Sequence, residues 1–179
     1  MVSLRMKYCF SFDCYTDYYL NFVLMRHLYD YIYHYLISNS RHGTHSPFVY
    51  ALADQVIYQK DYERKGEVAV PASIPAHQKE LIKNILSFWG IAKLGDDWND
   101  VEAEAYWLEK LPALDDALLQ VLTSGKPLFV KNPYSRQNRA LWRQMLQKKE
   151  VTVSINLFHF GILLYRPVQH KEDFLLRQV

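Results

Sequence analysis

The stretch VTVSINLFHFGILLYR, residues 151–166, decides the fold class. Residues 151–156 alternate apolar and polar side chains, which predicts a β-strand with one buried face. Residues 161–165 form a short apolar run that follows closely in the sequence. Strands so near each other pair in antiparallel fashion, so we expect a hairpin at one edge of a sheet. Residues 174–176 are expected to add an edge strand.

Upstream of this hairpin, helical and strand-like segments alternate. Residues 91–94 and 127–131 are short apolar runs that predict strands, and Gly90 and Gly125 are typical residues after helix ends. Apolar residues at steps of three and four predict helices at residues 15–38, 47–59, 76–89, 101–110, 113–122 and 135–147. Such alternation predicts an α/β protein with helices on both faces of the sheet.

The predicted domain organisation is an N-terminal helical extension, residues 1–60, followed by an α/β domain, residues 76–179, in one globular unit. The connection at residues 60–75 is polar at first and then contains two prolines. Met25 offers a second start site, so it stays open whether residues 1–24 belong to the native protein. The length of 179 residues suits a single domain.

Composition and charge limit the classes of partner. The net charge is only +2, so we expect no nucleic-acid binding. Residues 15–37 are apolar but contain several charged side chains, so we expect no membrane span. The two cysteines, Cys9 and Cys14, are expected to be reduced thiols, and the N-terminus lacks a signal-peptide pattern. These features predict a cytoplasmic protein.

Tyrosine and phenylalanine crowd the first predicted helix. The residues are Tyr15, Tyr18, Tyr19, Phe22, Tyr29, Tyr31, Tyr33 and Tyr35. One helix face cannot bury all of them, and tyrosine is favoured at interfaces where one end is apolar and the other wet. We therefore expect core packing combined with a homodimer contact through this helix.

Two segments carry a resemblance to a known family. RHGTHSPFVY, residues 41–50, and residues 151–166 with their 174–177 tail resemble class I S-adenosylmethionine-dependent methyltransferases common in Bacteroidetes-type bacteria. In that group an HG-HSPFVY segment precedes a Rossmann-like core, and a VT-(I/L)DLF--G--F-R hairpin ends it. Residues 131–142 resemble the strand, loop and helix before that hairpin. The resemblance covers about half of the chain and implies a Rossmann-like fold with an antiparallel C-terminal hairpin.

The middle of the chain departs from this family. The family places a glycine-rich turn after its first strand and an acid after its second, which together hold the cofactor. Here Gly95-Asp96-Asp97 supplies one glycine, and residues 101–107 predict a helix where the second strand is expected. Lys131-Asn132 replaces an acidic pair at the end of a later strand. The resemblance therefore implies a reduced fold that has lost S-adenosylmethionine.

Three functions follow from these departures. The first is a methyltransferase-like protein without cofactor binding or catalysis, retained as a binding or assembly module. The second is a small active methyltransferase that uses S-adenosylmethionine through an atypical site. The third is a remnant with no selected role. No catalytic residue and no metal ligand is assigned under the first.

The candidate site residues fall in three places. Gly95, Asp96 and Asp97 are either a vestigial cofactor turn or a loop whose aspartates bond the local backbone. His42 and His45 are either metal ligands together with His34 or residues of the segment that starts the second helix. Asn132 and Tyr134 are candidates because they lie in the segment that resembles the family's strand and loop before the hairpin, where the family places an acidic pair. In the basic run around residues 135–149, a solvated helix face is preferred to a site for an acidic partner, and the run comprises Arg136, Arg139, Arg143, Lys148 and Lys149.

Overall fold

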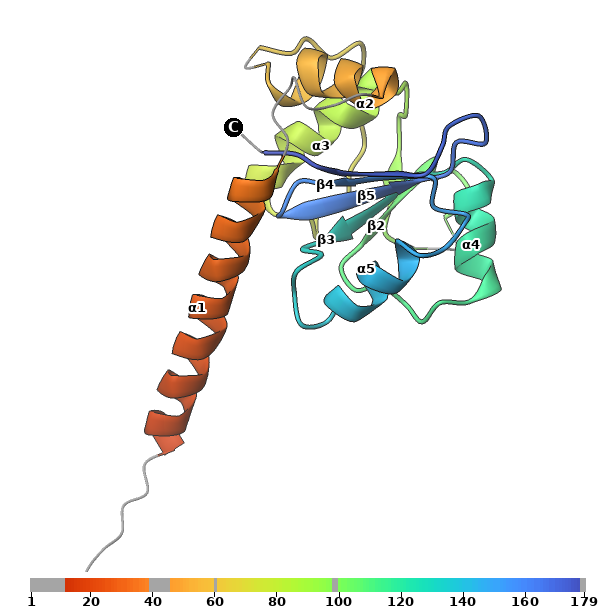
Figure 1. Cartoon of the computed structure of the whole chain (residues 1–179). Coiled ribbons are helices and arrows are strands. Elements are labelled where there is room, and N and C mark those ends of the chain that lie inside the picture. Colours follow the sequence, from red (N-terminus) through yellow and green to blue (C-terminus); the bar gives the residue numbers. More distant parts are fainter. Residues whose placement is uncertain (1–11, 39–45, 60, 98–99, 178–179) are drawn as a thin grey trace, which may run out of the picture.

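The computed structural model describes residues 12–38, 46–59, 61–97 and 100–177, with side chains from residue 23 onward. These residues form a mixed α/β structure with a six-stranded sheet and five α-helices (Figure 1). The elements in chain order are α1 (Phe12–Ile37), α2 (Pro47–Leu52), the π-helical turn η2 (Ala53–Ile57), α3 (Ala76–Phe88), β1 (Leu94–Gly95), β2 (Ala105–Leu108), α4 (Asp116–Thr123), β3 (Leu128–Lys131), α5 (Arg139–Met145), β4 (Val153–Asn156), β5 (Phe160–Leu164) and β6 (Glu172–Leu175).

The strands lie side by side in the order β1-β2-β3-β5-β4-β6. β1, β2 and β3 are parallel neighbours, and β4 is parallel to β6. β5 runs antiparallel to both of its neighbours, β3 and β4. All strands except β5 therefore share one direction, and their carboxyl ends meet at the same edge of the sheet.

The predicted hairpin is confirmed as the β4–β5 pair, in which Ile155 lies opposite Ile162. Its position differs from the expectation of an edge, because β5 is inserted between β3 and β4 and β6 forms the edge. The prediction that β4 buries one face is wrong. Ser154 is 2% exposed, and its hydroxyl donates to Asp173 at 2.6 Å, which allows a polar residue on the second covered face.

Helices cover both faces of the sheet, as predicted (Figure 1). α2, η2 and α3 pack on one face, where Trp107 and Phe129 belong to the apolar core. α4 and α5 pack on the other, where Tyr106 and Leu128 belong to a second core. Neighbouring residues of β2 and β3 thus enter opposite cores, as the alternation of side chains along a strand requires. β2, β4 and β5 are buried on both sides.

The prediction of a helix at residues 101–110 is wrong, because this segment contains strand β2. Glu102, Ala103 and Glu104 favour a helix in isolation. However, all four residues of β2 are buried, and the strand pairs with β1 on one side and β3 on the other. A strand covered on both faces is continuously apolar and lacks the alternation by which strands are recognised.

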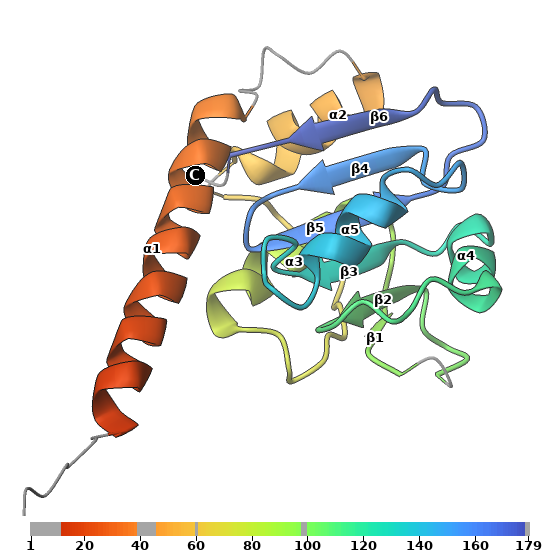
Figure 2. The same cartoon turned by 60° about the horizontal axis from the view of Figure 1, so that its bottom comes forward.

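Helix α1 lies outside both layers. The arrowheads of β4 and β6 point toward it in Figure 2, so it crosses the carboxyl edge of the sheet. Its buried side chains are polar: Asp30, His34 and Ser38 at steps of four residues. The rings of His27 and Tyr31 add aromatic contacts to Phe158, each at 5.1 Å between centroids. His34 Nε2 lies 3.0 Å from the carbonyl oxygen of Leu176, directly after β6.

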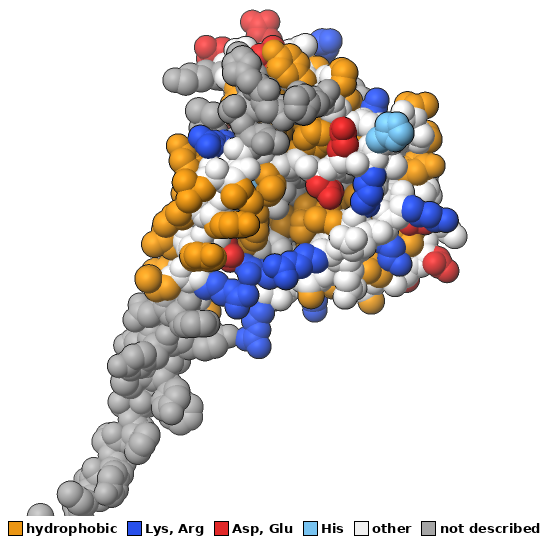
Figure 3. Space-filling model, in the orientation of Figure 1, with side chains coloured by type: hydrophobic (Ala, Val, Ile, Leu, Met, Phe, Trp, Pro, Cys, Tyr) orange, Lys and Arg blue, Asp and Glu red, His pale blue; other side chains and the backbone are white. Residues whose placement is uncertain are grey.

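The apolar side of α1 faces away from the domain, and Figure 3 shows hydrophobic side chains gathered along it. Tyr29, Tyr31, Tyr33 and Tyr35 are all exposed, and Leu36 is 70% exposed. Tyr29 and Tyr33 therefore do not pack into the core, whereas the ring of Tyr31 lies 5.1 Å from that of the buried Phe158. Tyr15, Tyr18, Tyr19 and Phe22 lie outside the residues whose side chains are described. The polar stripe contacts the sheet edge because that edge presents carbonyl, hydroxyl and guanidinium groups, which apolar side chains leave unpaired.

Within the described part of the chain, each helix is too short or too polar to cross a lipid bilayer.

Candidate functional site

The carboxyl edge of the sheet is where a functional site is expected in this architecture. In open α/β sheets, ligands bind beyond the carboxyl ends of parallel strands. The residues that directly follow these ends are Asp96 after β1, Glu109 after β2, Asn132 after β3, Leu157 after β4 and Leu176 after β6. The predicted candidates Asp96 and Asn132 thus share one edge.

Gly95 at the end of β1 packs against the loop that follows it. A Cβ added at Gly95 would lie 2.8 Å from the Cβ of Ala103, closer than real side chains come. Lys93 holds the same loop down, because its ammonium group donates to Asp100 at 3.0 Å and to Glu102 at 2.9 Å. The glycine therefore allows close approach of the chain to itself, and that loop covers the space beside it.

Asp96 and Asp97 are exposed and lie in the turn after Gly95. Ser73 Oγ donates to Asp96 at 3.3 Å, and the backbone N–H of Asp100 donates to the carbonyl oxygen of Asp97 at 3.1 Å. A small cleft of about 270 Å³ opens here, lined in part by Asp96 and by Trp107. These contacts are those of a loop that bonds its own neighbourhood.

Glu109 is an acid that the sequence prediction missed. Because residues 101–110 were predicted to be helical, no strand ending in an acid was expected, and that expectation is wrong: β2 leads directly into Glu109. Its carboxylate accepts a hydrogen bond from Lys131 Nζ at 2.6 Å. The two charges at the ends of β2 and β3 therefore satisfy each other on the surface.

Asn138 joins the ends of the same two strands. This side chain is 1% exposed. Its Nδ2 donates to the carbonyl oxygens of Glu109 at 3.1 Å and Lys131 at 2.5 Å, and its Oδ1 accepts from the N–H of Leu111 at 2.9 Å. No sequence pattern points to it, because its partners lie far away in the chain. Its role is to fix this edge of the sheet.

Asn132 adopts a left-handed backbone conformation, with φ of 38°. Asparagine tolerates this region better than most residues. Its N–H donates to the carbonyl oxygen of His159 at 2.8 Å, and its carbonyl oxygen accepts from Ser135 at 3.0 Å. Its side-chain Oδ1 is buried and has no hydrogen-bond partner within the described structure. An acceptor without a donor is therefore held at this edge.

Tyr134 contacts α1 through His34. The Tyr134 hydroxyl lies 3.0 Å from His34 Nδ1, and the carbonyl oxygen of Leu176 lies 3.0 Å from His34 Nε2. Because a carbonyl oxygen only accepts, Nε2 carries the proton, and Nδ1 accepts from the tyrosine hydroxyl. Burial lowers the pKa of His34, opposed by the bond to Leu176, so this neutral form is favoured.

The pKa of Tyr134 moves in the opposite direction. Burial of the phenol raises it first, and the negative charge of Asp30 raises it further, while the positive charge of Arg139 lowers it. The tyrosine is therefore a protonated hydrogen-bond donor, and the pair with His34 consists of two neutral groups. It positions α1 and lacks the charge of an activated nucleophile.

Phe158 is the centre of an aromatic group at the same edge. Its ring lies 5.6 Å from His34, 5.3 Å from Tyr134 and 5.2 Å from His159, measured between centroids. His159 faces His77 at 5.6 Å. Burial lowers the pKa of His159, and the nearby histidines lower it further. A hollow of about 240 Å³ lies between these rings and α1.

Two of the three histidines of the predicted metal site are not among the described residues. His42 and His45 lie outside the described residues, and His34 is engaged with Tyr134 and Leu176. Across the described ranges, no three histidine, cysteine, aspartate or glutamate side chains gather as metal ligands do.

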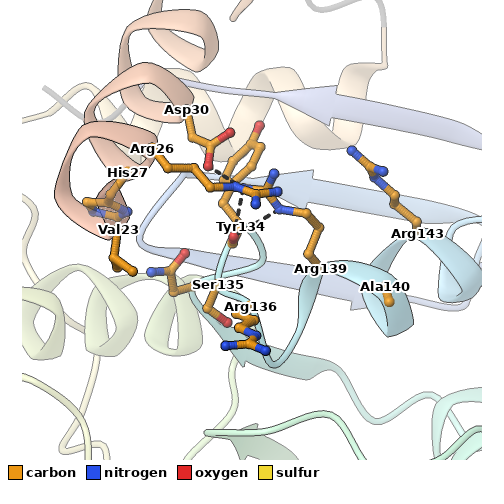
Figure 4. Close-up of a pocket in the computed structure, with 11 residues that line it drawn as sticks. Val23, Arg26, His27, Asp30, Tyr134, Ser135, Arg136, Arg139, Ala140 and Arg143 are labelled. Atoms are coloured by element: carbon orange, nitrogen blue, oxygen red, sulfur yellow. Dashed lines mark hydrogen bonds and ion pairs between the residues drawn. The ribbon is translucent and has the colours of Figure 1, made fainter. Parts of the chain in front are cut away.

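The basic run is not simply a solvated helix face. Arg139 turns inward, forms an ion pair with Asp30 of α1, and donates to the carbonyl oxygen of Tyr134 from Nε at 3.0 Å and from Nη2 at 2.8 Å (Figure 4). This ion pair and the His34 bonds are the main polar anchors of α1. A hollow of about 710 Å³ lies beside them, between α1 and α5.

Comparisons of the chain with protein-family models, with curated proteins and with solved structures find no match. The chemistry of the site therefore rests on the residues described above. This edge offers neutral hydrogen-bonding groups, paired charges at the ends of β2 and β3, and a group of arginines beside α1. Such an arrangement suits binding better than proton abstraction or nucleophilic attack.

Proposed function

We propose that this chain is a methyltransferase-like protein of reduced fold that no longer binds S-adenosylmethionine and serves as a binding or assembly module. One observation carries the proposal: the loop at Asp100 and Ala103 lies against Gly95, where the family places the cofactor. The mixed sheet with its inserted antiparallel strand β5 supports the kinship, alongside the sequence segments that resemble the family.

The small volume of the cleft at the end of β1 supports the proposal that the chain no longer binds the cofactor. The cleft beside Asp96 measures about 270 Å³. Sites for drug-sized ligands usually measure about 300–1,000 Å³ and enclose most of the ligand. β1 is also the outermost strand of the sheet, and beyond it only Ala69 pairs with Lys93. An acid on a further strand, which would hold the ribose, is thus not provided by the described residues, and the site does not fit the cofactor.

The exposed apolar surface of α1 supports the proposed role as a binding or assembly module. Tyr29 and Tyr33 stack at 6.3 Å between centroids, and both are about half exposed or more, at 67% and 49%. Leu24, Met25 and Leu36 are exposed by 65–70% on the same helix. Contiguous apolar surface of this kind marks an interaction site in soluble proteins. We propose that a second copy of the chain covers it, with the two α1 helices packed together.

The cofactor part of the proposal is tested by titration. The purified chain is titrated with S-adenosylmethionine and, separately, with S-adenosylhomocysteine, and its melting temperature is followed. A ligand at a hundredfold excess over its Kd stabilises a native protein by about 2.7 kcal/mol. We expect no shift at millimolar ligand. A saturable rise in melting temperature contradicts the proposal.

The assembly part is tested by light scattering after size exclusion. We expect a dimer that dissociates when Tyr29→Ala and Tyr33→Ala are combined, because the exposed aromatic rings supply the contact area. Tyr50→Ala is the matched control, since Tyr50 is also exposed, at 40%, but lies on α2. A monomer at all concentrations, or equal loss with Tyr50→Ala, contradicts this contact.

A small active methyltransferase remains the second candidate, and Glu109 is the observation that favours it. An acid does follow a strand next to β1, although Lys131 neutralises it at 2.6 Å. If the native chain binds S-adenosylmethionine and Glu109→Gln abolishes the binding, this candidate replaces the first.

A further inference from the structure

The hollow between α1 and α5 gathers positive charge. Its lining includes Arg26 of α1, Arg136 just before α5, and Arg139 and Arg143 on α5 (Figure 4). Among the described residues of that lining, Asp30 is the one carboxylate. Four arginines against one aspartate give a local charge of +3, whereas the whole chain carries +2. The charge is thus concentrated here and nearly balanced elsewhere, and Figure 3 shows the blue side chains together where α1 meets the domain.

We propose that this hollow binds a small molecule that carries two or more phosphate groups. Arg26 lies on α1, and the other three arginines lie on α5 or just before it, so both walls of the hollow carry positive charge. Arginine guanidinium groups bind phosphate through paired N–H donors, with charge-assisted hydrogen bonds stronger than neutral ones. This inference does not depend on the proposed loss of S-adenosylmethionine.

Two of the arginines are available to a ligand. Arg139 already forms an ion pair with Asp30 and donates a hydrogen bond to the carbonyl oxygen of Tyr134. Arg26 and Arg143, in contrast, are exposed, and among the described residues no hydrogen bond or ion pair engages either guanidinium group. The Asp30–Arg139 pair holds α1 beside α5, so it fixes the distance across which the free groups meet an anion.

The remaining lining suits the rest of such a molecule. Val23 and Ala140 provide apolar surface, and Ser135 provides a hydroxyl group. Asn132 is also one of the lining residues and adds an amide side chain. Phosphate groups between the arginines and a polar body near Asn132 would satisfy both kinds of group.

Size and shape favour a small molecule over nucleic acid. The volume of about 710 Å³ falls within the usual range for small-molecule sites, about 300–1,000 Å³. A duplex requires a basic stripe along a surface that follows its backbone. Here the charges line a hollow, and the net charge of +2 gives no broad basic face.

The experiment is isothermal titration calorimetry of the full chain at low ionic strength. The probes are inorganic tripolyphosphate and adenosine triphosphate, with a short DNA duplex as a third arm. We expect saturable binding of both small probes that weakens as salt is added, since salt screens exposed charges. We expect Arg26→Gln and Arg143→Gln each to weaken Kd by about tenfold, the loss of one charge-assisted contact.

Lys149→Gln is the matched control, because Lys149 is an exposed cation of the same basic run outside the lining. It removes the same charge and should change Kd by less than about twofold, as a screened, distant charge does. All three side chains are exposed, and equal melting temperatures confirm that the variants fold. No binding of either small probe, equal weakening by Lys149→Gln, or binding of the duplex alone overturns the proposal.

Discussion

Helices α1 and α3 contact the same domain in opposite ways. α3 buries Ile82, Ile85 and Leu86 in the core beneath the sheet. α1 presents Asp30 and His34 to the sheet edge and leaves its leucines and tyrosines exposed. Apolar burial is non-directional and spread over many contacts. The docking of α1 depends instead on a few directional bonds, so single changes should release it without unfolding the domain.

Because α3 packs through apolar groups and α1 through polar groups, the two helices should respond differently to a change in pH. The buried residues Ile82, Ile85 and Leu86 of α3 pack in an apolar core, and its ion pair of Glu80 with Arg64 lies on the surface. The contacts of α1 with the sheet edge include the ion pair of Asp30 with Arg139 and the hydrogen bonds of His34. Hydrogen bonds to charged groups weaken when either partner loses its charge. We therefore expect the position of α1 to depend on pH.

The largest expected effect comes from the same substitution placed on each helix. Ile85→Ala on α3 removes a fully buried side chain and should lower the free energy of unfolding by about 2–5 kcal/mol. Ile32→Ala on α1, where Ile32 is 48% exposed, should change it by less than about 0.5 kcal/mol. Denaturant unfolding measures both. Equal losses would show that α1 packs as α3 does.

A smaller effect is expected from breaking the ion pair of α1. Asp30→Asn leaves Arg139 without its charged partner and should weaken the docking of α1 by about 1.5–3 kcal/mol. Hydrogen exchange should accelerate at residues 24–37 and stay unchanged in β3 and β5. Glu80→Gln breaks an ion pair with Arg64 in which Glu80 is 70% exposed, and should cost at most about 1 kcal/mol. Unchanged exchange in α1 would contradict the anchoring role of Asp30.

The smallest expected effect is a pH dependence. The pKa of His34 is lowered from 6.5 by burial, so the unfolded chain binds the proton more readily than the folded chain. His159 behaves alike, next to His77 and His27. The stability contributed by the neutral rings is therefore complete above about pH 6.5 and declines as the pH falls below that value.

Unfolding midpoints at about pH 7.5 and about pH 5.5 check this, a range in which most carboxylates stay ionised. We expect the native chain to lose stability at the lower pH. Combining His34→Gln with His159→Gln should flatten the dependence. A native chain that is equally stable at both pH values, or a double variant that retains the full slope, contradicts this role of the two histidines.

Local sequence patterns predicted much of the architecture. The hairpin of β4 and β5 followed from apolar patterning, and Gly90 and Gly125 do adopt the left-handed conformation after helices, with φ of 73° and 90°. Strand β2 was missed because Ala105-Tyr106-Trp107-Leu108 has no alternation, and only its place between two other strands makes it extended. Propensity carries no such information about neighbours.

The site was foreseen in part. Asn132 and Tyr134 were predicted as candidates from the resemblance of their segment to the family, and they lie at the carboxyl edge of the sheet. The partner of Tyr134 is His34, 100 residues away in the chain, and no local pattern links the two. The direction in which α1 turns its polar stripe is likewise set by the unpaired groups of the sheet edge, which belong to other segments.

The insertion of β5 between β3 and β4 has a consequence for synthesis. α1, β1, β2 and β3 are synthesised before β4, β5 and β6, and β3 and β4 have no common neighbour until β5 pairs with both. Before that the nascent chain can form only the part of the sheet made of β1, β2 and β3, and α1 still lacks the carbonyl group of Leu176 that His34 contacts. Closure of the sheet and attachment of the first helix should occur together, in one late step of folding.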